Sequence, residues 1–326
     1  SAVEAYGKAR ALMSASGGKN ASGRLAKHVL NDEGFAATPL AKLRAATIRD
    51  WRERLTNPAP PKIVGTGLAD QERRTMAPST LNRLLNDLRA ALNACYEDHR
   101  RELPAYLPAE IRIGTRAAPV ATEARRQLLS DAQVRAAVEA AFEVEPGGHF
   151  GRVVMTAAAT GARYSQLAAL RVGDVQVSLG RVLMPGSKKG RSPKAGPPVA
   201  VPLSDDVLDR LAPAIDGRSA DAALLVRWAY RNVGPFKWER ENLRPLGAAF
   251  EVEKQWAEVV RRANLPADTI MYALRHSSIV RCLRSGLPVR LVASLHDTST
   301  EMIERHYGAF IVDMTEDLAR RATLTL

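Results

Sequence analysis

Apolar residues recur at helical spacing along most of this chain, and that spacing fails over residues 104–128. The failing stretch contains prolines and several basic residues, which is typical of a linker between two domains. A chain of 326 residues is long enough to form two hydrophobic cores. We therefore predict a mainly α-helical protein, with a helical domain at 1–110, a linker at 111–128 and a second domain at 129–326.

The second domain should also contain a small β-hairpin. Residues 177–203 alternate in polarity and turn on glycine and proline, as a hairpin does, so this domain is of α+β type. The Trp-bearing stretch 238–265 and the segment 272–310 are expected to be helical, as is the tail that follows. In the first domain the strongest helix is expected over residues 79–100, where leucines recur at helical spacing.

The charge balance points to a polyanionic partner. Lys and Arg total 47 against 35 Asp and Glu, which gives a formal net charge of +12. Such an excess favours nucleic acid, and less often an anionic membrane surface. The chain has no apolar run near the ~20 residues that cross a bilayer, and its first residues show no secretory pattern. We predict a cytoplasmic protein in which the two cysteines, Cys95 and Cys282, are buried thiols.

Several reaction classes lack their signatures. Carboxylates are scattered, so we find no cluster for a metal-dependent nuclease, and no phosphate-binding glycine loop or Gly-x-Ser-x-Gly elbow is present. We therefore expect no cofactor and no metal. Arginine, lysine, histidine and tyrosine remain, and this set suits attack on a phosphodiester. Guanidiniums can stabilise the charged oxygens, a phenol can be the nucleophile, and a lysine or histidine can protonate the leaving oxygen.

The segment 272–310, "YALRHSSIVRCLRSGLPVRLVASLHDTSTEMIERHYGAF", gathers these residue types. With "ATGARYSQLAALRVGDV" at 159–175 it resembles the two sequence boxes of the tyrosine recombinase, or phage integrase, family. The resemblance places Arg163 and Arg275 on the two catalytic arginines and Tyr307 on the nucleophile. The hairpin resembles the one whose turn holds the catalytic lysine. Lys188 is the candidate there, with Lys189 as the alternative.

The sequence departs from the family pattern at three positions. Tyr272 stands where the family has the histidine of its His-x-x-Arg motif, and Gln166 stands where it has glutamate. Gapless alignment puts Asp297 on a second family histidine. Because a carboxylate would repel the scissile phosphate, we expect His296 to turn toward the phosphate and Asp297 to cap the following helix. Tyr272 is expected to donate a hydrogen bond to the phosphate.

The resemblance also implies how DNA is held. It predicts a two-domain, C-shaped clamp on double-stranded DNA, assembled as a tetramer in which the tail after Tyr307 packs on a neighbouring protomer. Accessory directionality or DNA-bending proteins and a bacterial, nucleoid-associated location follow from the same resemblance. The remaining candidates for DNA contact are polar or basic side chains in both domains: Asn82, Arg83, Lys189, Arg191, Lys194 and His276.

The predicted function is site-specific recombination through a 3′-phosphotyrosine, with integration or excision of a mobile element. Two alternatives stay open. A type IB topoisomerase has the same fold and covalent chemistry but acts as a monomer without a defined site. A DNA-binding regulator would keep the clamp and have lost activity through the changes at Tyr272 and Asp297.

Overall fold

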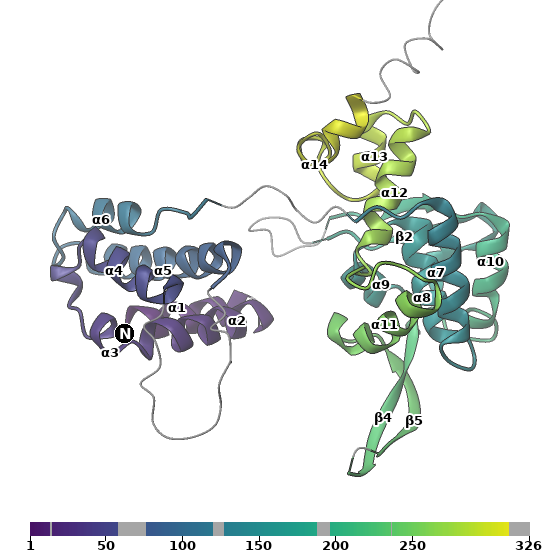
Figure 1. Ribbon diagram of the computed structural model, residues 1–326, viewed down its shortest axis with the longest axis horizontal. Helices are drawn as coiled ribbons and strands as arrows, with labels where there is room; N and C mark the ends of the chain where they lie inside the picture. Colours follow the sequence, from purple (N-terminus) through teal and green to yellow (C-terminus); the bar gives the residue numbers. More distant parts are fainter. Residues whose placement is uncertain (14, 58–75, 120–126, 188–195, 236, 313–326) are drawn as a thin grey trace, which may run out of the picture. The chain divides into compact units, whose positions relative to one another are not determined.

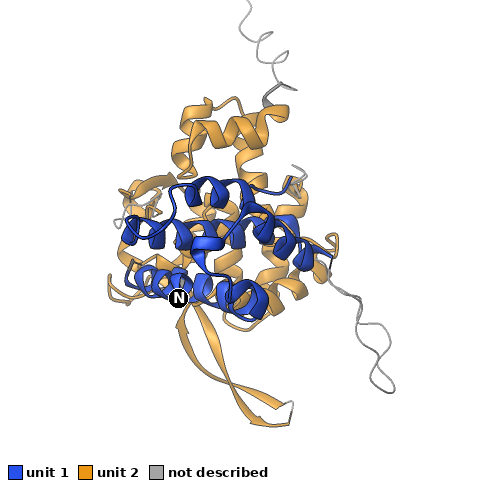
Figure 2. Cartoon of the chain, turned by 90° about the vertical axis from the view of Figure 1, so that its left-hand side faces the viewer, with its two compact units in different colours: residues 1–124 blue, residues 125–326 orange. Residues whose placement is uncertain are grey.

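The computed structural model describes residues 1–13, 15–57, 76–119, 127–187, 196–235 and 237–312. The chain divides into two compact units, residues 1–124 and residues 125–326, shown in blue and orange in Figure 2. Each unit has its own hydrophobic core, so each can be described by itself. The expected clamp shape remains a prediction.

The first unit is helical throughout its described residues (Figure 1). Its α-helices are α1 (Ala2–Met13), α2 (Ala15–Leu25), α3 (Glu33–Ala36), α4 (Ala45–Thr56), α5 (Pro78–Asp98) and α6 (Leu107–Gly114). The predicted strong helix is α5, and its leucine stripe is buried. Trp51 is fully buried in the same core and stacks on Phe35 with ring centroids 4.7 Å apart. The leucines of α5 therefore form part of the core of this unit.

The start of the predicted linker, at residue 111, falls inside a helix of the first unit. Residues 107–114 form helix α6, in which Leu107 and Ile111 are fully buried in the core of the first unit. Pro108 lies in the first turn of this helix, where the missing N–H has no helical partner to lose. We had taken the prolines of this stretch as a mark of a linker, but Pro108 lies at a helix start, where it is compatible with the helix.

The second unit combines eight α-helices with two antiparallel sheets in its described residues. The helices are α7 (Asp131–Glu143), α8 (His149–Thr160), α9 (Tyr164–Ala169), α10 (Asp205–Leu211), α11 (Glu253–Arg262), α12 (Ala273–Arg284), α13 (Val289–Leu295) and α14 (Thr300–Val312). The strands are β1 (Val175–Gln176), β2 (Arg181–Met184), β3 (Val199–Pro202), β4 (Val226–Gly234) and β5 (Lys237–Pro245). Helix α8 is buried along almost its whole length and carries the core.

The predicted hairpin is present as β2 and β3. The two strands pair antiparallel, with Val182 opposite Val201 and Met184 opposite Val199, and β1 adds a short third strand. Residues 188–195 of the connection lie outside the described residues.

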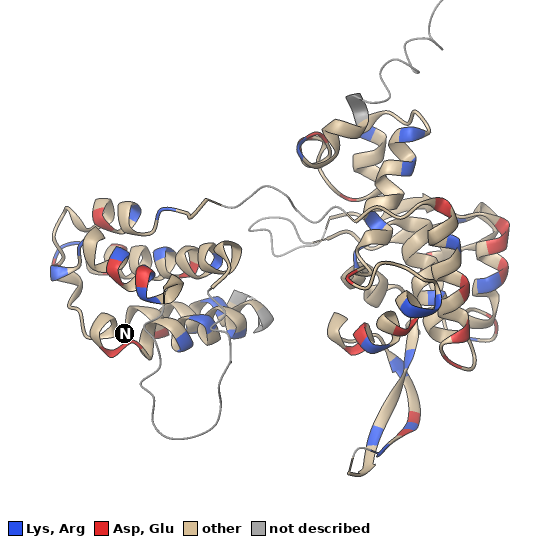
Figure 3. Cartoon of the chain, viewed as in Figure 1, with Lys and Arg blue, Asp and Glu red and all other residues tan. Residues whose placement is uncertain are grey.

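A second hairpin was not predicted. Strands β4 and β5 pair over nine residues each and project from the unit (Figure 1), whereas we expected helix from residue 238 onward. All of β5 is exposed, so it has no alternation of buried and exposed residues that sequence could reveal. Figure 3 colours the Lys and Arg positions blue, and they occur on this hairpin as well as elsewhere in both units. Helix begins again only at α11, with Glu253.

Helices α12, α13 and α14 form a small hydrophobic core of their own, apart from the main one. Ile279, Val292 and Ile303, one from each helix, are buried in it. Tyr307 lies in the same cluster. The prediction of helices over 272–310 is therefore confirmed, and they hold the candidate nucleophile in a packed environment.

Candidate active site

A tight turn between α8 and α9 presents Arg163. Helix α8 ends at Gly161, whose φ of +60° lies in the left-handed region that favours glycine. A Cβ added there would come within 2.6 Å of the His296 ring and 2.8 Å of Ser278 Oγ. The Arg163 backbone N–H donates to Gln166 Oε1 (3.1 Å) as α9 begins. The turn at Gly161 thus positions the first arginine.

Arg275 lies against the same turn. It is only 3% exposed, on the first turn of α12, and donates to the carbonyl oxygens of Gly161 (Nη1, 2.8 Å) and His296 (Nη2, 2.7 Å). Burial lowers the pKa of this guanidinium, as does the charge of Arg163, while Tyr272 and Tyr307 raise it. An arginine in this setting stays protonated at neutral pH. Two guanidiniums therefore lie close to the Gly161 turn and to residues 296–297.

Tyr307 reaches this region from α14. The side chain is 6% exposed, and its hydroxyl lies 2.6 Å from Nδ1 of His276 on α12. Because Tyr307 affects the pKa of Arg275, the phenol and the guanidinium are electrostatic neighbours. The candidate nucleophile and both arginines, from three separate parts of the sequence, are thus brought together.

Tyr272 also belongs to this cluster. It immediately precedes α12 and is 44% exposed, with its ring edge-on to His276 at a centroid distance of 5.0 Å. A hydrogen bond that the Arg275 guanidinium donates to the Tyr272 side chain is among the influences that raise the pKa of Arg275. Its position beside the second arginine supports the predicted phosphate contact, which stays a prediction.

His296 does not have the environment that we predicted. The residue is 3% exposed, and both ring nitrogens lie near protein groups: Nε2 is 3.0 Å from Ser278 Oγ and Nδ1 is 2.9 Å from the Val292 carbonyl. Burial lowers its pKa to about 4, which keeps the ring neutral. We expected this side chain to turn toward the phosphate, but it turns inward and packs beneath the Gly161 turn.

This burial predicts acid sensitivity. Unfolding would return the His296 pKa from about 4 to the ordinary value of 6.5, so the unfolded chain gains a proton first as the pH falls. The free energy of unfolding is therefore highest above pH 6.5, and the titration of His296 lowers it by about 3 kcal/mol as the pH falls to 4. Denaturant unfolding between pH 7 and pH 5, where carboxylates stay ionised, should show a smaller pH slope in His296→Gln. Equal slopes would contradict the assignment.

Asp297 joins three elements of the site. Its φ is +47°, and its Oδ2 accepts from the backbone N–H of Ser187 (2.8 Å) and from Gln166 Nε2 (3.3 Å). Nη1 of Arg163 lies 3.5 Å from the same oxygen and donates to the Asp297 carbonyl (3.1 Å). The predicted capping role is wrong, because Ser299 Oγ accepts the N–H of Met302 at the start of α14 (3.3 Å). Asp297 instead ties the turn, the β2–β3 hairpin and the chain before α14 together.

Gln166 and Asp297 therefore depart from the family pattern as a pair. Gln166 is buried and donates both to Asp297 and to the Pro185 carbonyl (2.7 Å). The glutamate that the family has at this place could donate neither bond. It would also set two carboxylates side by side in a buried site.

We expect Gln166→Glu to lower the free energy of unfolding by about 2–4 kcal/mol, through lost donors and buried like charges. Adding Asp297→Asn should recover much of this loss, because the new amide can donate to the glutamate. Thermal denaturation measures both variants. Gln176→Glu is the matched control, since Arg181 Nε already donates to Gln176 (2.6 Å). A single variant as stable as the control would contradict the pairing.

The other residues that we predicted to contact DNA differ in their surroundings. Asn82 exchanges two hydrogen bonds with the backbone of Ala118, at 2.9 and 2.7 Å, so its amide is used within the first unit. Arg83 is exposed on α5. His276 bonds with Tyr307, and its predicted contact with DNA stays a prediction. The hairpin candidates lie outside the described residues: Lys188, Lys189, Arg191 and Lys194.

An open groove lies beside Arg163. Its volume is about 760 Å³, and Gln166, Ser187, Asp297 and Met302 contribute to its walls. The groove thus connects the Arg163 turn, the base of the β2–β3 hairpin and the start of α14. A phosphate approaching Arg163 by this route would meet Asp297 as well.

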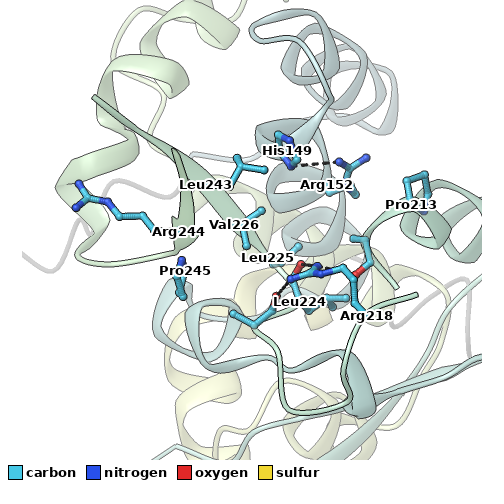
Figure 4. Close-up of a pocket in the computed structure, with 12 residues that line it drawn as sticks. His149, Arg152, Pro213, Arg218, Leu224, Leu225, Val226, Leu243, Arg244 and Pro245 are labelled. Atoms are coloured by element: carbon cyan, nitrogen blue, oxygen red, sulfur yellow. Dashed lines mark hydrogen bonds between the residues drawn. The ribbon is translucent and has the colours of Figure 1, made fainter. Parts of the chain in front are cut away.

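A second pocket, of about 420 Å³, lies at the opposite end of α8 (Figure 4). Arg218 donates to carbonyl oxygens at its edge, Arg152 lies 3.3 Å from His149 Nδ1, and Arg244 points away. His149, which lines this pocket, is the first residue of α8, and Gly161 follows the last, so the two lie ~18 Å apart along the helix axis. Its arginines are held by the protein and do not converge, so we do not assign the chemistry to it.

Two further observations concern the described residues. They contain no group of three or more histidine, cysteine, aspartate or glutamate side chains placed to hold a metal ion. None of the helices in this part of the chain is long and apolar enough to span a membrane. Cys95 and Cys282 are free and only partly buried, contrary to the full burial we expected, and burial raises the pKa of both thiols.

The sequence matches the model of the phage integrase family over residues 128–309, which is more than half of the chain. The chain belongs to the phage integrase family. Members of this family of tyrosine recombinases cleave and rejoin DNA. The matched region contains Arg163, Arg275 and Tyr307. No curated protein sequence matches the chain significantly.

Solved structures of integrases and recombinases have the same fold. The Tn1549 transposon integrase in complex with transposon right end DNA matches with a TM-score of 0.64 and 15% identity, over 93% of each chain. The XerH recombinase bound to a palindromic difH substrate matches with a TM-score of 0.61 and 14% identity, over 95% of this chain and 81% of that one. A lambda integrase dimer bound to a core site gives 0.58 and 15%, over 100% and 79%. At such identities the likeness shows the fold alone.

Sequence reasoning missed two features of the site. It did not place His276 on the hydroxyl of Tyr307, although a histidine four residues after Tyr272 shares its helix face. It also did not find Asp297 as the link between Arg163 and the hairpin. No local signal could have revealed that link, because the three partners of Asp297 are 110 to 134 residues away.

Proposed function

We propose that this chain is a site-specific recombinase in which Tyr307 attacks the scissile phosphate of a DNA strand. The observation that carries the proposal is the meeting of Tyr307, Arg275 and Arg163 around the Gly161 turn. A phenol beside two guanidiniums can form a phosphotyrosine and stabilise the charge on the non-bridging oxygens. The bond energy is retained in that link, so the strand can be rejoined without ATP.

The two arginines have different tasks in this proposal. Arg275 is buried and fixed by two carbonyl oxygens, so it is preorganised to bind one non-bridging oxygen. Arg163 is about one-third exposed and lies beside the groove, where it binds the phosphate as DNA enters. Tyr272 donates a further hydrogen bond. The resemblance assigns protonation of the 5′-oxygen to Lys188, with Lys189 as the alternative.

DNA is the proposed partner of both units. A net charge of +12 and the DNA bound in the similar solved structures support this assignment. The first unit acts as the core-binding domain, with exposed Arg83 as its candidate contact, and the hairpin lysines and arginines contact the backbone. We propose a tetramer on DNA, accessory directionality or bending proteins, and a cytoplasmic, nucleoid-associated location. The substrate is a mobile element that is integrated or excised.

A covalent trap tests the proposal. Duplexes that the protein selects from a random pool supply the site, and a nick close to the cleavage position lets the cut fragment diffuse away. We expect a protein–DNA adduct on a denaturing gel, with the phosphotyrosine mapped to residue 307. Tight binding without an adduct would support the regulator alternative. Adducts on any sequence, with relaxation of supercoils, would support the topoisomerase alternative.

A further inference from the structure

His276 occupies a distinctive place in the site. Its ring lies beside two tyrosines: Tyr272, edge-on at 5.0 Å, and Tyr307, tilted by 48° at 5.8 Å between centroids. Its Nδ1 is 2.6 Å from the hydroxyl of Tyr307, a distance typical of a strong hydrogen bond. We infer that His276 is the general base that takes the proton of Tyr307 during strand cleavage. The inference rests on the proposed function.

A base is needed at this position. An ordinary phenol has a pKa of ~10 and is almost entirely protonated at neutral pH, whereas an ordinary imidazole, with a pKa of ~6.5, can accept a proton there. Proton transfer by a positioned side chain contributes about 10²- to 10⁴-fold to a rate. The geometry of the bond therefore places a suitable acceptor on the atom that must lose its proton.

The other candidate bases are placed less well. His296 is buried, and its ring nitrogens lie against Ser278 and the Val292 carbonyl. Asp297 is engaged with Arg163, Gln166 and Ser187. Tyr272 is itself a phenol and a weaker base than imidazole at neutral pH. Among these residues, His276 is the one with a bond to the nucleophile.

Strand cleavage moves one proton to His276 and one to the 5′-oxygen. The lone pair on Nδ1 of neutral His276 accepts the Tyr307 proton while the phenol oxygen forms a bond to phosphorus. The bond between phosphorus and the 5′-oxygen breaks, and that oxygen takes a proton from the general acid, assigned above to Lys188. In rejoining, the 5′-hydroxyl attacks phosphorus and returns its proton to Lys188, the Tyr307–phosphorus bond breaks, and the departing Tyr307 oxygen recovers its proton from the His276 imidazolium. Arg275 stabilises the charge in both directions.

Single-turnover cleavage of the nicked duplex tests the inference in full-length protein. We expect His276→Ala to slow adduct formation by about 10²-fold or more, with DNA binding and melting temperature retained. His276→Gln should be similarly slow, because its amide can bond to Tyr307 but cannot take the proton. Added imidazole should restore part of the rate to His276→Ala. His306→Ala is the matched control, since His306 is adjacent to the nucleophile, and it should react normally.

A second substrate separates a base from an acid. A 5′-bridging sulfur gives a leaving group that needs no proton, so it should rescue Lys188→Ala and leave both His276 variants slow. Rescue of the His276 variants by this substrate would make His276 the acid and overturn the inference. Normal rates in His276→Gln alone would show that His276 only positions Tyr307. Normal rates in both variants would show that His276 has no role in cleavage. Absence of an adduct with the wild-type protein would instead contradict the proposed function.

Discussion

Replacing Tyr307 with phenylalanine is expected to abolish the covalent adduct with the nicked duplex. The change removes the only oxygen of this side chain that can bond to phosphorus, so we expect no residual product above background. The ring remains in the core of α12, α13 and α14, and the loss of one hydrogen bond to His276 should cost about 1 kcal/mol or less of stability. A denaturing gel measures the adduct and a gel shift measures DNA binding.

The control for this variant is Tyr230→Phe. Tyr230 lies on the β4–β5 hairpin, is 38% exposed, and is remote in the sequence from the site. It should form the adduct at the wild-type rate. An adduct that persists in Tyr307→Phe, with the wild-type yield, would show that another residue attacks the phosphate.

Arg275→Ala should have the second-largest effect, on activity and on stability together. Loss of a preorganised cationic donor from a transition state costs about 10²- to 10³-fold in rate. The carbonyl oxygens of Gly161 and His296 also lose their donor in a buried site, which should lower the free energy of unfolding by about 2–4 kcal/mol. Single-turnover cleavage and denaturant unfolding measure the two effects separately. Arg275→Lys should retain part of each, because one ammonium cannot reach both carbonyls in the fork geometry of arginine.

Two comparisons make this prediction specific. Arg281→Ala changes an arginine on the same helix that is partly exposed and pairs with Asp131 (2.7 Å), so it should leave cleavage intact. Arg163→Ala should impair cleavage with less loss of stability, because Arg163 is about one-third exposed. If Arg275→Ala cleaved like Arg281→Ala, the buried guanidinium would be purely structural.

The fold class and the main catalytic candidates could be predicted from sequence because their signals are local or carried by ordered motifs. Leucine spacing identified α5. Helical spacing over residues 272–310 identified the helical segment that carries Arg275 and Tyr307. Each of these features depends on side chains within a few residues of one another.

Other features could not be predicted because they depend on partners far away in the chain. Strand β5 is exposed along its length, and it becomes a strand only by pairing with β4. The negative charge of Asp297 led us to expect His296 at the phosphate, but the His296 ring is buried, with its nitrogens against Ser278 Oγ and the Val292 carbonyl. The left-handed backbone at Asp297 then aimed the carboxylate at Arg163 and Ser187.

The sequence by itself determined the helical framework, the family and the types of residue that carry the proposed chemistry. Only the tertiary structure decided which of those residues touch. It placed His276 on Tyr307 and Asp297 among Gln166, Ser187 and Arg163. The physical reason is that helix periodicity is set by neighbouring residues, whereas a buried polar group must find its hydrogen-bond partner wherever the packed chain supplies one.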